Sequence, residues 1–161
     1  MVAAAIAGLA LYYLQVYGYY HEAPAPDEGV SLVSISSNAS EPILTDNFRA
    51  IDADSSPIRY RACFTTPERP QALDERFERY GDGEPRNAPF WFSCFDAEEI
   101  GRMIETGEAH VYIAQRNIEF GIDRVVAVAE DGRGYVWEEI NECGDKAYDG
   151  TPLGEDCPPR E

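Results

Sequence analysis

Charged side chains are absent from the first 20 residues, Met1 to Tyr20, and no Lys or Arg occurs before Arg49. An apolar run of about 20 residues is long enough to cross a hydrocarbon core as a helix. Tyrosine favours the bilayer surface, where its ring meets hydrocarbon and its hydroxyl meets water. Five tyrosines crowd the end of this run: Tyr12, Tyr13, Tyr17, Tyr19 and Tyr20. The sequence predicts a transmembrane anchor over 1–20, with membrane lipid as its partner and these tyrosines at the membrane surface.

A cleaved signal peptide is the alternative, and it requires small residues at the cleavage site. The tyrosines up to Tyr20 occupy the usual place for that site. Ala23-Pro24-Ala25 offers small residues, but Pro26 follows them and is a poor context for cleavage. We therefore expect the anchor to be retained.

Basic residues are scarce throughout, with 13 Lys and Arg against 30 Asp and Glu and a net charge of −17. Phosphate backbones and anionic lipid repel such a domain, which argues against nucleic-acid binding and against lying flat on a membrane. The domain would attract cations or a basic protein. The simplest interpretation is that the acidity maintains solubility.

Cysteine is limited to four residues with no CxxC motif, which argues against thiol redox catalysis and a thiolate zinc site. Four cysteines permit three pairings. Cys143 and Cys157 bracket a loop-rich tail, Cys63 ends a strand, and Cys94 lies in an aromatic run. We expect the pairs Cys63–Cys94 and Cys143–Cys157, which indicate an oxidising compartment and a domain outside the cytoplasm.

The periodicity of apolar residues divides the chain into the anchor, a Pro-rich acidic spacer over 21–29 and one domain over 30–161. Alternation predicts strands over 30–35, 58–64 and 109–113, and a hairpin with strands 125–129 and 135–140 around the turn 130–134. Helices are expected from Pro70 to Tyr80 and from Asp96, as N-cap with Glu99, to Gly107. The fold class is α+β: one small disulfide-containing domain built on an antiparallel sheet with two short helices.

Residues that carry catalysis are few. Only His21 and His110 are present, and no GxSxG motif occurs. The stretch Asp52-Ala53-Asp54 begins like a calcium loop, but Pro57 and Cys63 stand where that loop needs Gly and Glu. Pairs such as Glu98-Glu99 and Glu138-Glu139 are most simply interpreted as solvated. We predict no catalytic residue, metal site or cofactor.

An aromatic run extends from Phe90 to Phe95, and Trp137 adds to it. Core packing near a disulfide is the favoured interpretation. The alternative is a partner contact made by Phe90, Trp91, Phe92 and Trp137, because aromatic residues anchor interfaces.

Three stretches together resemble a family of single-span proteins from alphaproteobacteria of the Rhodobacter type: YYLQVYGYY at 12–20, IDADSSPIRYRACF at 51–64 and GIDRVVAVAEDGRGYVWEEIN at 121–141. Members are sometimes labelled histidine kinase. This chain lacks the glycine-rich ATP lid and the length for kinase domains. The resemblance implies a bacterial inner membrane, with the domain in the periplasm.

The expected function is therefore non-enzymatic: a single-pass periplasmic protein acting through protein contacts, as an accessory or assembly subunit of an inner-membrane complex or by binding a basic periplasmic protein. Two alternatives stay open. One is a sensor domain for a small ligand or cation, and the other is a small hydrolase with unidentified acidic catalytic residues.

Overall fold

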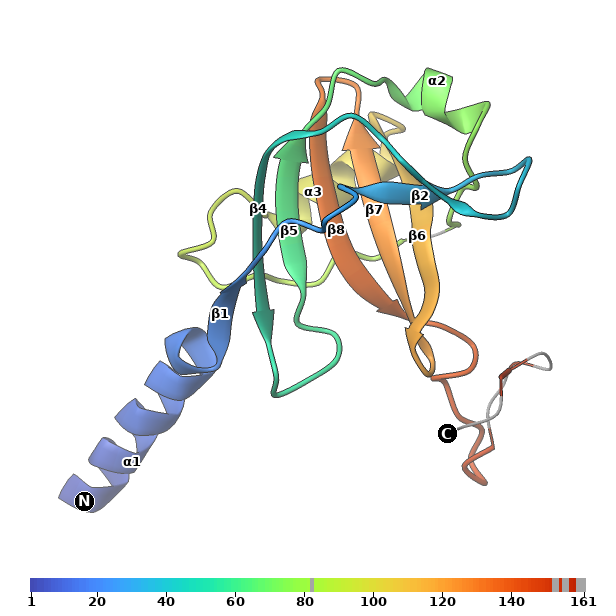
Figure 1. The fold of residues 1–161 in the computed structure, drawn as a ribbon. Coiled ribbons are helices and arrows are strands. Elements are labelled where there is room, and N and C mark those ends of the chain that lie inside the picture. Colours follow the sequence, from blue (N-terminus) through green and yellow to red (C-terminus); the bar gives the residue numbers. More distant parts are fainter. Residues whose placement is uncertain (82, 152–153, 155–156, 159–161) are drawn as a thin grey trace.

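The computed structural model describes residues 1–81, 83–151, 154 and 157–158, and its centre is an antiparallel six-stranded sheet (Figure 1). The strands follow the order β1-β4-β5-β8-β7-β6. A separate two-stranded sheet pairs β2 with β3. The bounds are β1 Tyr20–Ala23, β2 Ser31–Val33, β3 Ser40–Pro42, β4 Asp46–Ala53, β5 Arg61–Thr65, β6 Ala109–Glu119, β7 Ile122–Ala129 and β8 Arg133–Ile140. The α+β class on an antiparallel sheet is confirmed.

The helices occupy the periphery. The chain begins with α1 Val2–Tyr13, which continues directly into the π-helical turn η1 Leu14–Gly18. The short α2 Pro70–Asp74 lies at one end of the sheet, and α3 Ala97–Glu105 lies across its back (Figure 1). As predicted, Asp96 caps α3, and its carboxylate accepts hydrogen bonds from the backbone N–H groups of Glu98 and Glu99.

Both faces of the main sheet are covered, which explains the unbroken burial of β7 from Val125 to Ala129. On the front face in Figure 1, β2 and β3 cross the strands, and a core forms around Leu32, Phe77 and Tyr112. On the back face, α3 and the segment 88–97 enclose a second core around Phe95, Met103 and Trp137. We call these the β2 face and the α3 face.

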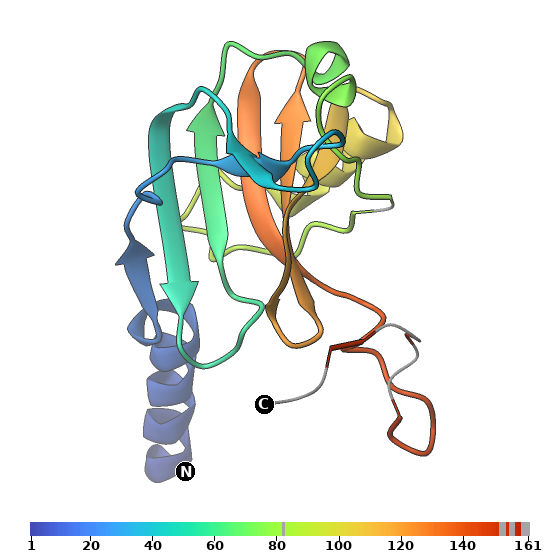
Figure 2. The same ribbon diagram turned by 45° about the vertical axis from the view of Figure 1, so that its right-hand side comes forward.

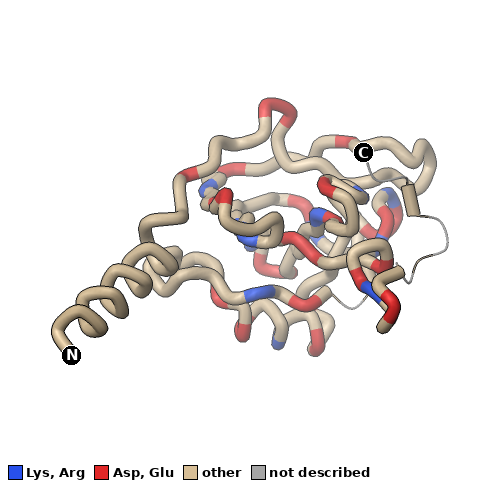
Figure 3. The backbone as a smooth tube through the Cα atoms, turned by 90° about the horizontal axis from the view of Figure 1, so that it is seen from below, with Lys and Arg blue, Asp and Glu red and all other residues tan. Residues whose placement is uncertain are grey.

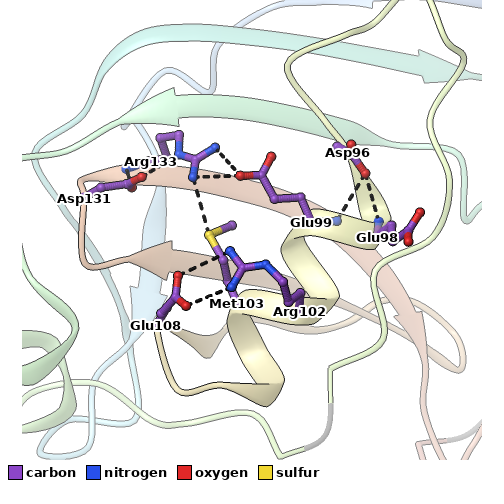
Figure 4. A network of polar contacts seen from close by, with 8 residues as sticks. All are labelled: Asp96, Glu98, Glu99, Arg102, Met103, Glu108, Asp131 and Arg133. Carbon is purple, nitrogen blue, oxygen red and sulfur yellow. Dashed lines mark hydrogen bonds and ion pairs between the residues drawn. The ribbon is translucent and has the colours of Figure 1, made fainter.

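An ion pair joins α3 to the β7–β8 hairpin (Figure 4). The carboxylate of Glu99 accepts from the guanidinium of Arg133, 3.0 Å away, and does not close the capping box expected for it. Arg133 also pairs with Asp131, and Arg102 pairs with Glu108. Burial alone would raise the pKa of Asp131, but the backbone and side-chain hydrogen bonds from Arg133 outweigh it and lower that pKa.

The helix predicted to run from Pro70 to Tyr80 is wrong beyond Asp74. The segment 77–80 is extended and lies between β2 and β6. The backbone N–H of Glu78 donates to Val33 O at 2.8 Å, and that of Tyr80 donates to Val111 O at 2.8 Å. These bonds to neighbouring strands replace helical ones, and they bury Phe77 in the core that a helix was expected to supply.

The predicted spacer 21–29 also begins differently. Its first residues, His21 to Ala23, belong to β1 and pair with β4 in the register His21↔Asp52. Only the residues that follow β1 remain as a connection to β2. The predicted turn 130–134 is shorter as well, because β8 begins at Arg133 and Gly132 adopts a left-handed φ of 89°.

The two disulfides are Cys63–Cys94 and Cys143–Cys157, the same pairing that the sequence predicts. Their Cα atoms are 6.3 Å and 5.5 Å apart. Cys63 lies in β5 and belongs to the core of the α3 face, so its bridge holds the segment before α3 against the sheet.

Candidate functional site

The first candidate region is α1, which projects from the domain and meets it only at its C-terminal end (Figures 1 and 2). The helix has no buried residue and no charged residue in its first or last turn. The backbone tube in Figure 3 carries neither sign of charge along it. Large apolar side chains are exposed around it: Val2, Ile6, Leu9 and Leu11 are 59–75% exposed. No helix in the described part of the chain is both long and apolar enough to cross a membrane.

An aromatic junction joins η1 to the domain. The indole N–H of Trp91 donates to the backbone oxygen of Val16 at 2.7 Å. The same ring stacks on Tyr17, with centroids 6.1 Å apart, and meets Tyr20 edge to face at 5.9 Å. Arg59 donates to the hydroxyl of Tyr20 at 3.0 Å. Of the five tyrosines assigned to the membrane surface, Tyr12, Tyr13, Tyr17 and Tyr19 are exposed, and Tyr20 is half-buried.

The four aromatic residues considered for partner contact separate into two groups. Phe90 is 69% exposed and packs edge to face on Tyr17, and Trp91 is half-buried at the junction. Phe92 and Trp137 are 2% and 0% exposed, because they fill the core of the α3 face. The contact interpretation is therefore wrong for these two, and their core packing is confirmed.

His110 connects α2 to β6. Its Nδ1 lies 3.1 Å from Oδ1 of Asp74, and the hydroxyl of Tyr112 donates to the same oxygen at 2.7 Å. Burial would raise the pKa of Asp74, but the hydrogen bonds from Tyr112 and His110 lower it overall. These hydrogen bonds hold α2 against β6. His21 lies far along the sheet in β1, on the opposite edge from β6.

A second candidate region is a row of polar residues on the β2 face. Arg124 of β7 lies opposite Glu138 of β8, and the guanidinium donates to the carboxylate at 2.7 Å. The Cζ of Arg124 also lies 3.9 Å from the centroid of the Tyr60 ring. Glu138 is only 5% exposed, and burial raises its pKa despite the attraction of Arg124. This corrects the interpretation of Glu138 as solvated.

Two hollows meet at Arg124. The upper hollow, about 380 Å³, lies between the segment 26–31 and the sheet, and Tyr60, Val126 and Val136 line it. The lower hollow, about 340 Å³, is lined by Asp52, Asp54, Glu119 and Glu138. We call the two hollows, with Asp52, Tyr60, Arg124 and Glu138 between them, the polar cleft. Arg124 was not singled out in the sequence, and Tyr60 was read only as an apolar strand residue.

One unpaired polar atom lies beside this cleft. Tyr60 is 6% exposed, and its ring lies against the guanidinium of Arg124. The Nε of Arg124 is buried without a partner. Burial raises the pKa of Tyr60, against the opposing effect of Arg124. Buried polar groups are nearly always hydrogen-bonded, and among the described residues the Nε of Arg86 is a second buried atom without a partner.

Within the described part of the chain, no three His, Cys, Asp or Glu side chains form a group that could hold a metal ion. Asp52 and Asp54, which resemble the start of a calcium loop, lie at the end of β4 and in the turn after it. The carboxylate of Asp52 accepts a hydrogen bond from the backbone N–H of Ala53 at 2.8 Å. Both acids line the lower hollow.

The fold and the aromatic junction together describe a small disulfide-containing α+β domain that follows an apolar helix in the chain. A family model described as a family of unknown function, DUF6446, matches residues 30–158, and the chain belongs to this family. The matched range begins after α1, η1 and β1 and includes Asp52, Tyr60, Arg124 and Glu138. No curated protein and no solved structure matches the chain.

Proposed function

We propose that this protein is a non-enzymatic, single-pass membrane protein whose domain lies in the periplasm of a bacterial inner membrane and acts through protein contacts. One observation carries the membrane part: α1 is apolar on every side and exposed on every side. A helix that is hydrophobic all round is stable only when its whole surface is covered. Lipid provides such cover, and 12 residues of α1 followed by five of η1 approach the 17–25 that span a bilayer.

The aromatic junction supports the same assignment. Tyr17, Tyr19 and Phe90 expose their rings at the end of the helix, where a membrane surface would lie. Aromatic rings accumulate at that depth. The two disulfides favour an oxidising compartment for the domain.

The membrane assignment is tested on the full chain by carbonate extraction of membranes. We expect the wild type to stay in the membrane pellet, and Leu9→Arg to be released into the supernatant, since Arg at the centre of a span costs about 2.5–3.5 kcal/mol. Glu41→Arg, an exposed change in β3, is the matched control and should stay in the pellet. Release of the wild type would contradict the anchor.

Protease added to spheroplasts should digest the domain, and full protection would place it in the cytoplasm.

The proposal that the domain acts through protein contacts is based on its negative surface charge. Four exposed acids, Glu84, Asp96, Glu98 and Glu105, surround a shallow hollow beside α3 that contains one basic residue, Arg102. A basic periplasmic protein or a basic surface of a membrane complex would complement it. A photo-crosslinking residue at position 98 should give an adduct in native membranes that weakens with salt, because exposed charges are screened within about 10 Å at 0.1 M. The same residue at position 41 is the control, and equal adducts at both positions would contradict the proposal.

A further inference from the structure

Three arginines lie together beside the aromatic junction. Arg61, the first residue of β5, is 3% exposed, and its Nε donates to the backbone oxygen of Arg86 at 3.0 Å. Its Nη1 donates to the backbone oxygens of Ile58 and Tyr60 at 2.9 Å and 2.7 Å, on either side of Arg59. Arg61 therefore joins the two segments that carry Arg59 and Arg86. We call these three residues the arginine group.

No member of the arginine group forms an ion pair with a carboxylate of the described residues. The arginine ion pairs there belong to Arg76, Arg79, Arg102, Arg116, Arg124 and Arg133. The guanidinium of Arg61 is held by backbone oxygens, and the Nε of Arg86 is buried without a partner. In a chain with 30 acidic and 13 basic residues, such a group of arginines leaves positive charge for an anion from outside the chain.

The acids near the group are bonded to other residues. The charge of Arg86 opposes the rise that burial causes in the pKa of Glu139. The carboxylate of Glu139, however, accepts from the indole N–H of Trp137 and the backbone N–H of Glu84, each at 2.6 Å. Glu139 therefore does not take the place of an anion bound to Arg86.

Arg61 remains charged although it is buried. Burial is the main cause that lowers its pKa to about 10, and the positive charges of Arg59 and Arg86 also lower it. Glu138 acts in the opposite direction, but its carboxylate is already paired with Arg124. At neutral pH the group thus holds three positive charges close together.

The arginine group lies at the anchored end of the domain. The connection from β4 to β5, which carries Arg59, is at the end of the sheet from which α1 projects (Figures 1 and 2). Arg59 donates to the hydroxyl of Tyr20 at 3.0 Å, and Tyr20 lies two residues beyond η1. Arg59 and Arg86 are half-buried, so each leaves part of its side chain open to solvent. If α1 is the anchor, both arginines lie at the depth of the lipid headgroups.

We propose that Arg59 and Arg86 bind the phosphate of an anionic lipid headgroup, with Arg61 behind them as a positioning residue. The inference rests on the proposed membrane anchor. Guanidinium groups match phosphate oxygens in geometry and charge. The acidic remainder of the domain is repelled by the same lipids. Attraction at the anchored end and repulsion elsewhere would hold the domain upright on the membrane.

Fluorescence quenching of the full chain in phosphatidylcholine vesicles tests the proposal. Phosphatidylglycerol or phosphatidylcholine with brominated acyl chains is added at equal mole fraction, and quenching of Trp91 at the aromatic junction is measured. The fully buried Trp137 gives a constant background. We expect association at Trp91 to favour phosphatidylglycerol about fivefold, the factor that one basic residue near an anionic membrane surface provides.

Variants of the group locate the charge responsible. Arg59→Gln and Arg86→Gln should each lower this preference, and the double variant should make quenching by the two lipids equal. Arg59→Lys keeps the charge and should keep most of the preference. Arg76→Gln is the matched control, because it removes the same charge from an exposed residue just after α2, at the other end of the sheet (Figure 1).

Equal quenching by both lipids in the wild type would overturn the proposal and leave the anchor standing, whereas no quenching by either would overturn both. A loss in Arg59→Lys as large as in Arg59→Gln would also overturn it, since the contact with Tyr20 and not the charge would then be the cause. Equal losses in Arg59→Gln and Arg76→Gln would do the same. Inorganic phosphate added at constant ionic strength should leave the preference unchanged, and its removal would assign the group to free phosphate.

Discussion

The two faces of the main sheet differ in how completely they are covered. On the α3 face, Phe95, Met103 and Trp137 pack in a closed core, and the disulfide Cys63–Cys94 holds the covering segment in place. Polar groups on this face are hydrogen-bonded: the indole N–H of Trp137 donates to Glu139 at 2.6 Å, and the buried guanidinium of Arg61 donates to the backbone oxygens of Ile58 and Tyr60. On the β2 face, a similar core occupies one end, and the other end carries the charged residues of the polar cleft. The α3 face is therefore closed by a disulfide-held segment, whereas the β2 face leaves a charged pair beside two hollows.

Removing the largest side chain of the closed face should have the largest effect. Trp137→Ala should reduce the free energy of unfolding by about 3–5 kcal/mol, because a fully buried ring leaves a cavity that the core cannot fill. Urea unfolding of the full chain in detergent measures it. The control is Tyr148→Ala, whose side chain is fully exposed and which should change stability by less than about 0.5 kcal/mol. Similar losses for both variants would mean that the α3 face is not the main core.

Removing each disulfide in turn should show that the bridge at the α3 face stabilises the protein more than the bridge in the C-terminal tail. Loss of the bridge between Cys63 and Cys94, in a variant with both changed to Ala, should cost about 3.5–4 kcal/mol by the loop-entropy model. The same double change at Cys143 and Cys157 should cost about 3 kcal/mol, since it closes a shorter loop. Thermal unfolding without reductant compares the two. A larger loss from the tail bridge would contradict the view that the first holds core elements together.

Two carboxylates on the β2 side should respond to pH with opposite signs. Glu138 has a pKa raised above 4.5, so the folded state binds its proton more tightly and loses stability as pH rises from 4.5 through the raised value. Asp74 has a pKa lowered below 3.8, so its contribution is full above 3.8 and is lost as pH falls through the lowered value. Each effect should be about 1 kcal/mol or less, and that of the half-exposed Asp74 is reduced by solvent screening.

Unfolding measured across this pH range in Glu138→Gln and Asp74→Asn checks the signs. Glu138→Gln should remove the decline above pH 4.5, and Asp74→Asn should remove part of the loss at lower pH. Glu105→Gln, an exposed residue of α3, is the control with an unchanged profile. A steeper decline in Glu138→Gln would show that its carboxylate stabilises the fold instead of opposing it.

The smallest effect is expected at Tyr60. Tyr60→Phe should change stability by less than about 0.5 kcal/mol, because the ring that lies against Arg124 is kept. Tyr112→Phe, on the same face, should cost about 1–2 kcal/mol, since its hydroxyl donates to Pro70 O and Asp74. Thermal unfolding of the two variants gives the comparison. Equal costs would show that the Tyr60 hydroxyl stabilises the fold as much as the Tyr112 hydroxyl does.

Elements with strong local signals were predicted from the sequence. The capping residue Asp96 and the apolar spacing after it indicate α3, and alternation indicates the hairpin of β7 and β8. The cysteine pairing followed from which cysteines border loops. The helix and hairpin signals depend on residues close together in the chain, whereas the bridge between Cys63 and Cys94 joins residues 31 positions apart.

Features that depend on distant partners were missed. The apolar residues Leu73, Phe77 and Tyr80 have helical spacing, but β2 and β6 on either side of residues 77–80 supply strand hydrogen bonds that only the folded chain provides. The Arg124–Glu138 pair was missed because the turn was expected to be 130–134. A loop ending at Gly132, which can adopt a positive φ, places these opposite charges in register. Which charged residues lie opposite each other on a sheet face depends on the register of the two strands. A register that is wrong by two residues does not place Arg124 opposite Glu138.

The direct passage of the apolar helix into β1 has a consequence for work on fragments. β1 covers the edge of β4 along residues 50–53, whose backbone groups would otherwise be unpaired on that side. A fragment that begins at residue 24, after the helix and β1, would therefore acquire an open strand edge along residues 50–53. Such an edge can pair with the same edge of a second molecule, so the fragment would self-associate even though its core is complete. Residues 20–23 thus act as a cap on the sheet.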